Sequence, residues 1–153
     1  MNVQVIGIKG DLGFDDIVRH FTELGGDVVL LDPGMVCGRD HVLSAVMHAE
    51  RAISNGTNRS KTLLTEIILY AAGDRQIGRA MEKMRPKSGK DGMVAVLLGI
   101  DDPRLDRISM VRCDDIMGPS PEKARNLGAD IFDGISCEDA VLEHVAMTDL
   151  LKQ

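Results

Sequence analysis

The chain has 153 residues, which suits a single domain with one hydrophobic core, and we expect one domain over residues 1–153. Its composition, 44% hydrophobic and 27% charged, is ordinary for a soluble globular protein, and neither a secretory leader nor a run of about 18 apolar residues is present. Three cysteines without paired spacing argue against a disulfide framework and against a zinc site. We therefore expect a cytoplasmic protein with no bound metal and no membrane partner.

The first part of the chain predicts a strand, a helix and a second strand. Residues 3–8 are a β-branched run, and apolar residues repeat at helical spacing over residues 14–24. The continuous apolar run at residues 28–31 is typical of a buried strand, and Asp32-Pro33-Gly34 predicts a turn after it.

This opening also permits an alternative function. Gly7, Gly10 and Gly13 lie between the first strand and the helix, and Asp32 ends the second strand, an arrangement similar to a dinucleotide-binding unit. Their spacing departs from G-x-G-x-x-G, in which the second glycine lets the backbone approach a pyrophosphate. A small nucleotide-dependent α/β enzyme that uses the Gly7–Gly13 turn is the alternative to the function favoured below.

A long helix is predicted at residues 39–55, ended by Gly56. It carries His41 and His48, which we expect on the helix surface because no third metal ligand accompanies them. The run at residues 93–100 is apolar enough for a central strand, after a loop at residues 85–92. Further elements are predicted as a strand at residues 108–113 and a short helix from Ser120 or Pro121 to Gly128.

Residues 58–84 predict two consecutive helices with a sharp joint. Ser60 is the expected N-cap of the first helix, and Gly73 ends it. Asp74 is the expected N-cap of the second, whose apolar positions are Ile77, Ala80, Met81 and Met84.

The same region carries a charge asymmetry. Eight basic and three acidic residues give residues 59–90 a net charge of +5, whereas the rest of the chain carries −11 because the whole chain carries −6. Cations concentrated on one helical hairpin of an acidic protein indicate an anion site, and nucleic-acid phosphates are the expected ligand. A solvated basic face is the alternative.

The last helix is predicted from Ser136, which with Asp139 resembles a capping box, to the C-terminus. Its apolar residues fall on two arcs: one holds Val141, Leu142, Val145 and Ala146, and the other holds Ala140, Met147 and Leu151. One arc suffices to cover the core, so the second is a candidate protein interface. Burial of both arcs in a groove is the alternative.

Together these elements predict a mixed α+β fold, helix-rich, with a small central β-sheet packed with several α-helices in one compact domain. We find no nucleophilic, acid–base or metal arrangement, and no Gly-rich phosphate loop followed by Lys-Ser or Lys-Thr. We expect no catalytic residue, no cofactor and no small-molecule substrate, and thus a protein that is not an enzyme.

A family resemblance lies in two helical motifs. The first is the Asn58-Arg59-Ser60 turn, Glu66 and Tyr70, then Gly73-Asp74-Arg75-Gln76-Ile77 with Ala80; the second is AVLEHVAMTDLLK from Ala140. With the opening strand and HAERAISNG from His48, they resemble the small kinase-binding subunit of the KEOPS complex, the PRPK-binding protein family, in its archaeal type. The resemblance covers most of the chain, and residues 101–134 show no visible match.

The resemblance implies a non-catalytic subunit that binds the small atypical kinase/ATPase of KEOPS and helps bring tRNA to the complex that makes threonylcarbamoyladenosine. With the terminal helix, it predicts kinase contacts from Val141, Leu142, Val145, Met147 and Leu150. With the basic hairpin, it predicts contacts with the 3′ end of tRNA, with Tyr70 beside them. The predicted tRNA-binding residues are Asn58, Arg59, Lys61, Arg75, Gln76, Arg79 and Lys83.

Overall fold

The computed structural model describes residues 1–87 and 90–151, in which six α-helices and four β-strands form. The predicted helix-rich α+β class is confirmed. By its contacts the chain divides into two compact units, residues 1–33 with 85–117 and residues 34–84 with 118–153. The expectation of one domain for the whole chain stays a prediction. Residues 88–89 of the predicted loop and the last two residues of the predicted terminal helix lie outside the described residues.

The first unit is a four-stranded sheet with the strand order β2-β3-β1-β4, in which all paired neighbours are antiparallel. Every residue of β3 is buried, so the predicted central strand is confirmed. The last strand is shorter than predicted and lies at the sheet edge. The strands are β1 (Val3–Gly10), β2 (Asp27–Leu31), β3 (Met93–Leu98) and β4 (Met110–Arg112).

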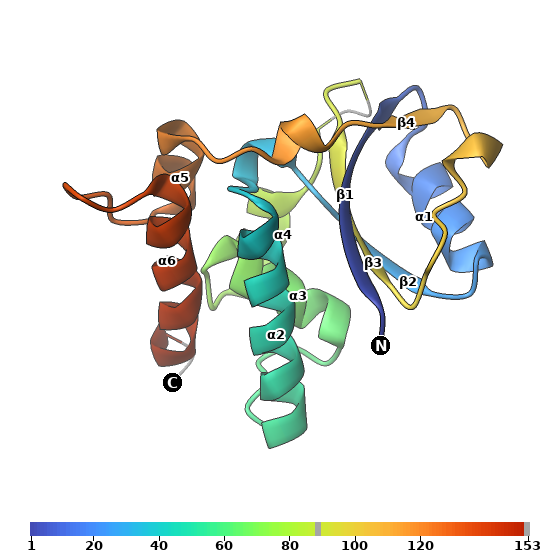
Figure 1. Ribbon diagram of the computed structural model, residues 1–153. Helices are drawn as coiled ribbons and strands as arrows, with labels where there is room; N and C mark the ends of the chain where they lie inside the picture. Colours follow the sequence, from blue (N-terminus) through green and yellow to red (C-terminus); the bar gives the residue numbers. More distant parts are fainter. Residues whose placement is uncertain (88–89, 152–153) are drawn as a thin grey trace. The chain divides into compact units, whose positions relative to one another are not determined.

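Helix α1 (Phe14–Glu23) covers one face of this sheet (Figure 1). Its buried residues Ile17 and Phe21 join a core with alternate residues of the strands, such as Ile6, Leu30 and Leu97. These strand residues share a face because side chains along a strand alternate between the two sides of a sheet.

The glycine-rich turn that the nucleotide alternative requires does not form. Gly7 and Gly10 lie within β1, and a Cβ at either position would lie about 2 Å from a backbone oxygen, of Cys113 or Ser109. These glycines therefore permit close approach of the backbone at residues 109–113. Moreover, β1 and β2 both pair with β3, which separates them, so they do not form an adjacent parallel pair of the dinucleotide-binding type.

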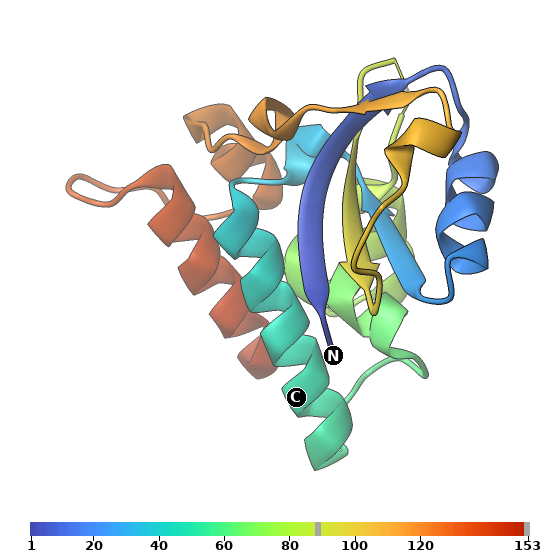
Figure 2. The same cartoon turned by 45° about the vertical axis from the view of Figure 1, so that its right-hand side comes forward.

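The second unit consists of five helices, with α2 packed against α3 and α6 (Figure 2). The predicted long helix has the predicted bounds, and left-handed glycines end three helices at Gly56, Gly73 and Gly128, as expected. The helices are α2 (Arg39–Asn55), α3 (Leu63–Ala72), α4 (Ile77–Met84), α5 (Pro121–Leu127) and α6 (Cys137–Leu151). Of the short 3-10 helices, Leu105–Arg107 and Asp114–Met117 belong to the first unit, and Pro33–Met35 begins at the last residue of its first segment.

The helix N-caps agree with the sequence only in part. Ser120 caps α5, and the Ser136 hydroxyl accepts from the N–H of Asp139 at 3.0 Å at the start of α6, as predicted. The expected cap at Ser60 is wrong, because Thr62 occupies that position and accepts from the Thr65 N–H. Ser60 instead donates to the buried carboxylate of Glu66.

His41 is fully buried, so its predicted place on the helix surface is wrong. Its Nδ1 accepts from the Cys37 N–H at 3.0 Å, and its Nε2 lies 2.8 Å from the Ala71 oxygen, to which it donates. Both bonds together require the neutral ring. Burial, the main cause, lowers the pKa of His41 to about 4.

This histidine makes the fold sensitive to mild acid. Because the pKa of His41 is lower in the folded than in the unfolded chain, its contribution is complete above pH 6.5 and is lost as the pH falls towards 4. We expect protonation of His41 to lower the free energy of unfolding by about 3 kcal/mol between pH 6.5 and pH 4. Urea unfolding between pH 4 and 7 measures the loss.

His41→Gln should flatten that pH dependence. His20→Gln is the matched control, because His20 also bonds a backbone oxygen, that of Pro103 at 2.8 Å, but is only half-buried. Equal pH dependence in the wild type and the His41 variant would show that His41 is not the acid-sensitive group.

Candidate functional site

The predicted tRNA-binding residues of the second unit fall into two groups at opposite ends of α3. Asn58, Arg59 and Lys61 precede the helix in the 58–62 turn, whereas Arg75, Gln76 and Arg79 follow it in the 73–79 segment. The ten residues of α3 separate the two groups by about 15 Å, at a rise of 1.5 Å per residue. The structure therefore shows two basic groups on one helix and not one cluster.

The 58–62 turn is built on a carboxylate that sequence reasoning did not select as a site residue. Glu66 is fully buried, and its Oε1 accepts from the Arg59 N–H at 3.1 Å, the Ser60 N–H at 2.9 Å and the Ser60 hydroxyl at 2.9 Å. The side-chain amide of Asn58 donates to the Ser60 oxygen. Glu66 thus fixes the backbone of the turn, while the side chains of Arg59 and Lys61 stay exposed.

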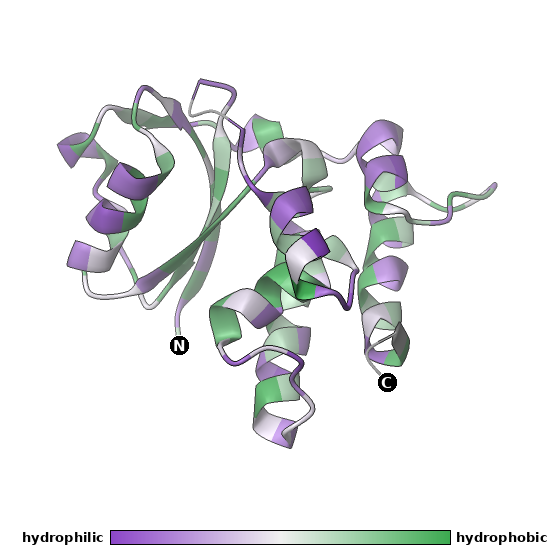
Figure 3. Ribbon diagram, turned by 180° about the vertical axis from the view of Figure 1, so that it is seen from behind, coloured by the Kyte–Doolittle hydropathy of each residue, from purple (hydrophilic) through white to green (hydrophobic). Residues whose placement is uncertain are grey.

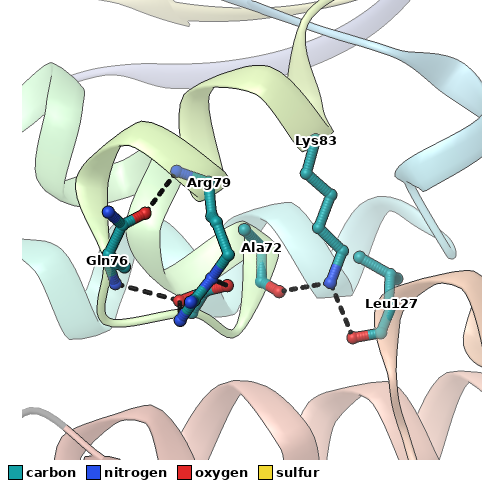
Figure 4. Close-up of polar contacts among 6 residues, drawn as sticks. Ala72, Gln76, Arg79, Lys83 and Leu127 are labelled. Carbon is teal, nitrogen blue, oxygen red and sulfur yellow. Dashed lines mark hydrogen bonds and ion pairs between the residues drawn. The ribbon is translucent and has the colours of Figure 1, made fainter.

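The 73–79 segment is also held by a carboxylate (Figure 4). Asp74 accepts from the Gln76 N–H at 2.9 Å and forms a two-pronged ion pair with the Arg79 guanidinium at 2.9 and 3.0 Å. The N–H of Arg79 donates to the Gln76 side chain, so Gln76 caps α4, whereas Asp74 was expected to do so. The hydrogen bond with Arg79 is the main cause that lowers the pKa of Asp74, which keeps the pair ionised.

Lys83, a predicted tRNA-binding residue, contacts the protein's own backbone. Its Nζ lies 3.0 Å from the Leu127 oxygen and 3.4 Å from the Ala72 oxygen, at the C-terminal ends of α5 and α3 (Figure 4). Helix C-termini carry partial negative charge, so the ammonium stabilises both ends. Burial is the main cause that lowers the pKa of Lys83. We therefore assign no anion contact to Lys83.

Tyr70 is buried and cannot stack on an exposed base in this conformation, so its expected place in an RNA site is wrong. Its hydroxyl donates to the Asp149 carboxylate, and burial together with this bond raises its pKa. The His48 ring stacks on Tyr70 with centroids 5.3 Å apart, and its Nδ1 lies 3.4 Å from Asp149. The three residues join α2, α3 and the C-terminal part of α6.

Helix α6 buries one arc and exposes another. The buried residues Ala140, Val141, Val145 and Thr148 face the second unit's interior, so Val141 and Val145, which were predicted as kinase contacts, do not lie on the exposed surface. The exposed arc comprises Leu142, which is half-buried, Ala146, Met147 and Leu150. Met147 and Leu150 expose 53% and 65% of their surface, whereas a surface helix without a partner ordinarily presents polar residues there.

Figure 3 shows that apolar and polar residues alternate along the described part of α6. The side chain of Leu151, which the sequence groups with Met147, lies outside the described residues. The exposed arc therefore runs over about 12 Å of helix, from Leu142 to Leu150, at 1.5 Å per residue.

Comparison with models of known protein families identifies the family of the chain. The family model of the kinase binding protein CGI-121 matches residues 16–149. The chain belongs to the CGI-121 family. The match spans both units of the fold and includes residues 101–134, where the sequence showed no visible likeness. No protein in a search of curated proteins matches the chain.

Membership of the CGI-121 family confirms the resemblance to the kinase-binding subunit of KEOPS. As its name states, the family binds a kinase, which is consistent with a regulatory subunit and suggests a non-catalytic one. No helix in the described part of the chain is long and apolar enough to cross a membrane. Among the same residues no group of three or more His, Cys, Asp or Glu side chains is placed to hold a metal ion.

Proposed function

We propose that this CGI-121 chain is a non-catalytic subunit of KEOPS that binds the complex's small atypical kinase/ATPase through the exposed arc of α6. We further propose that it recruits tRNA by its 3′ end, for threonylcarbamoyladenosine modification, through the 58–62 turn and the 73–79 segment. Kinase binding through α6 is supported by one observation: α6 leaves an apolar arc exposed in a chain of a kinase-binding family.

The exposed arc suits a stable protein contact because Met147 and Leu150 gain most from burial. Transfer of their apolar surface out of water on binding is favourable. The contacts that hold α6 against the unit, through Val141, Val145 and the Asp149–Tyr70 bond, leave the exposed arc in a fixed orientation before the kinase arrives. A fixed surface loses less conformational freedom on binding.

The two basic groups support RNA recruitment by their separation and exposure. A single-stranded end is able to run along α3 and place phosphates at both groups, whereas the deep groove of an RNA helix does not admit such side chains. Arg59, Lys61 and Arg75 are exposed, so we assign them the phosphate contacts. With Tyr70 buried, phosphate contacts dominate over base stacking.

The test is tRNA binding by the purified chain, with intact tRNA and with tRNA that lacks its 3′ tail. Three contacts give a log–log salt slope of about −2, so the affinity for intact tRNA should fall roughly 20-fold between 50 and 200 mM salt. Arg75→Ala should reduce the slope by about 0.7. Equal binding of intact and trimmed tRNA would contradict the RNA part, and micromolar binding of NAD or ATP would favour the nucleotide alternative.

Asp74→Asn should strengthen tRNA binding. The amide oxygen of Asn still accepts from the Gln76 N–H, but the ion pair that neutralises Arg79 is lost, so a fourth cation becomes available. We expect a several-fold higher affinity at low salt and a slope near −3.

The matched control for this variant is Asp16→Asn, which frees Arg19 from an exposed ion pair in the other unit. It should leave both the affinity and the slope unchanged. If the two variants behave alike, the gain reflects net charge alone and Arg79 does not lie at the RNA.

A further inference from the structure

The loop between α5 and α6 presents two large apolar side chains to solvent. Phe132 and Ile131 expose 58% and 40% of their surface. In two views the loop extends away from both helices (Figures 1 and 2). An aromatic side chain at such a position is a common anchor of protein interfaces.

A hydrogen-bonded turn fixes this presentation. The N–H of Ile135 donates to the Phe132 oxygen at 3.2 Å, which closes a four-residue turn. Its third residue, Gly134, has a φ of +89°, as a type II turn requires. The hydrogen bond thus holds Phe132 at the first position of a defined turn.

The charges around the loop favour a basic partner. Residues 130–151 contain six acidic residues and no Lys or Arg, so the formal charge of this segment is −6, equal to the charge of the whole chain. Asp130 and Asp133 flank the two apolar residues, and Asp139 and Glu143 are exposed on the following helix. Nucleic-acid phosphates would be repelled here, whereas a protein surface with Lys and Arg around an apolar pocket is complementary.

The loop and the exposed arc of α6 form one continuous stretch of chain. Ser136 ends the loop and caps α6 through the Asp139 N–H. Both parts combine exposed apolar residues with acidic neighbours and contain neither Lys nor Arg. The same partner surface therefore suits both.

We propose that residues 130–135 are a second docking element for the kinase, with Ile131 and Phe132 in an apolar pocket that Lys and Arg side chains surround. This inference rests on the proposed function of α6. The acidic residues accelerate the encounter, and the apolar residues prolong the complex.

Binding kinetics with the purified kinase subunit separate the two roles. Phe132→Ala should raise the dissociation rate at least tenfold with little change in the association rate. The double variant Asp130→Asn and Asp133→Asn should lower the association rate several-fold at 50 mM salt, and the difference should vanish at 500 mM. Val111→Ala is the control, since Val111 is an exposed apolar residue of β4 in the other unit and should have no effect.

The outcomes distinguish this inference from the function on which it rests. If Leu150→Asp abolishes kinase binding while the loop variants bind like the wild type, the inference is overturned and the role of α6 stands. If neither the loop variants nor Leu150→Asp change kinase binding, both the inference about the loop and the proposed role of α6 are overturned. If Phe132→Ala weakens tRNA binding and leaves kinase binding intact, the ring is an RNA contact and the inference is overturned.

Discussion

Leu150→Asp should reduce the affinity for the kinase more than 100-fold without unfolding the chain. In the complex the new carboxylate would lose its water within an apolar contact, which costs about 3–5 kcal/mol. In the free chain Leu150 is 65% exposed, so the substitution introduces no buried charge there. Titration calorimetry measures the affinity, and circular dichroism shows whether the fold is intact.

Val111→Asp provides a matched control, because Val111 is 66% exposed and lies in the other unit. It should bind the kinase like the wild type. Val145→Glu, in contrast, is uninformative about docking, since Val145 is fully buried and a carboxylate there would destabilise the fold itself. Unchanged affinity of the folded Leu150 variant would remove this end of α6 from the interface.

Glu66→Ala should destabilise the chain and abolish most tRNA binding. The N–H groups of Arg59 and Ser60 would lose their acceptor, and buried donors without acceptors cost about 1–3 kcal/mol each. We expect the free energy of unfolding to fall by about 3 kcal/mol overall. The 58–62 turn would no longer hold Arg59 and Lys61 in place, so tRNA affinity should fall in the variant even where it remains folded.

Glu66→Gln separates stability from charge, because a glutamine oxygen still accepts at least one of these bonds. Its free energy of unfolding, measured with urea, and its tRNA affinity should both lie between those of the wild type and the alanine variant. If Glu66→Ala retains wild-type tRNA affinity, RNA binding does not depend on an ordered 58–62 turn.

Local signals explain which parts of the fold the sequence predicted. The bounds of α2 follow from its helical spacing and from Gly56, whose left-handed conformation few other residues adopt at low cost. The short helix between Ser120 and Gly128 was predicted by a cap at each end. In these cases the relevant interactions lie within a few residues along the chain.

Features that depend on tertiary packing were not predictable in this way. The two predicted apolar arcs of α6 are both divided in the structure, because packing against α2, α3 and α5 buries Ala140, Val141 and Val145 and leaves Ala146 and Met147 exposed. The contact of Lys83 with the Leu127 oxygen was not predictable either, because the two residues lie 44 positions apart in the chain. The burial of Glu66 has one signal in the sequence, which is the position of a carboxylate among apolar residues on one face of a helix.

The exposed arc of α6 is tested most directly by crosslinking, since a crosslink reports contact and not loss of function. A photo-crosslinking phenylalanine analogue replaces Ala146, the exposed residue at the middle of the arc, and in a second chain it replaces Val111. On irradiation of each chain with the purified kinase subunit, we expect a crosslink to the kinase from position 146 and none from position 111. A crosslink from position 111 with none from position 146 would contradict docking through α6.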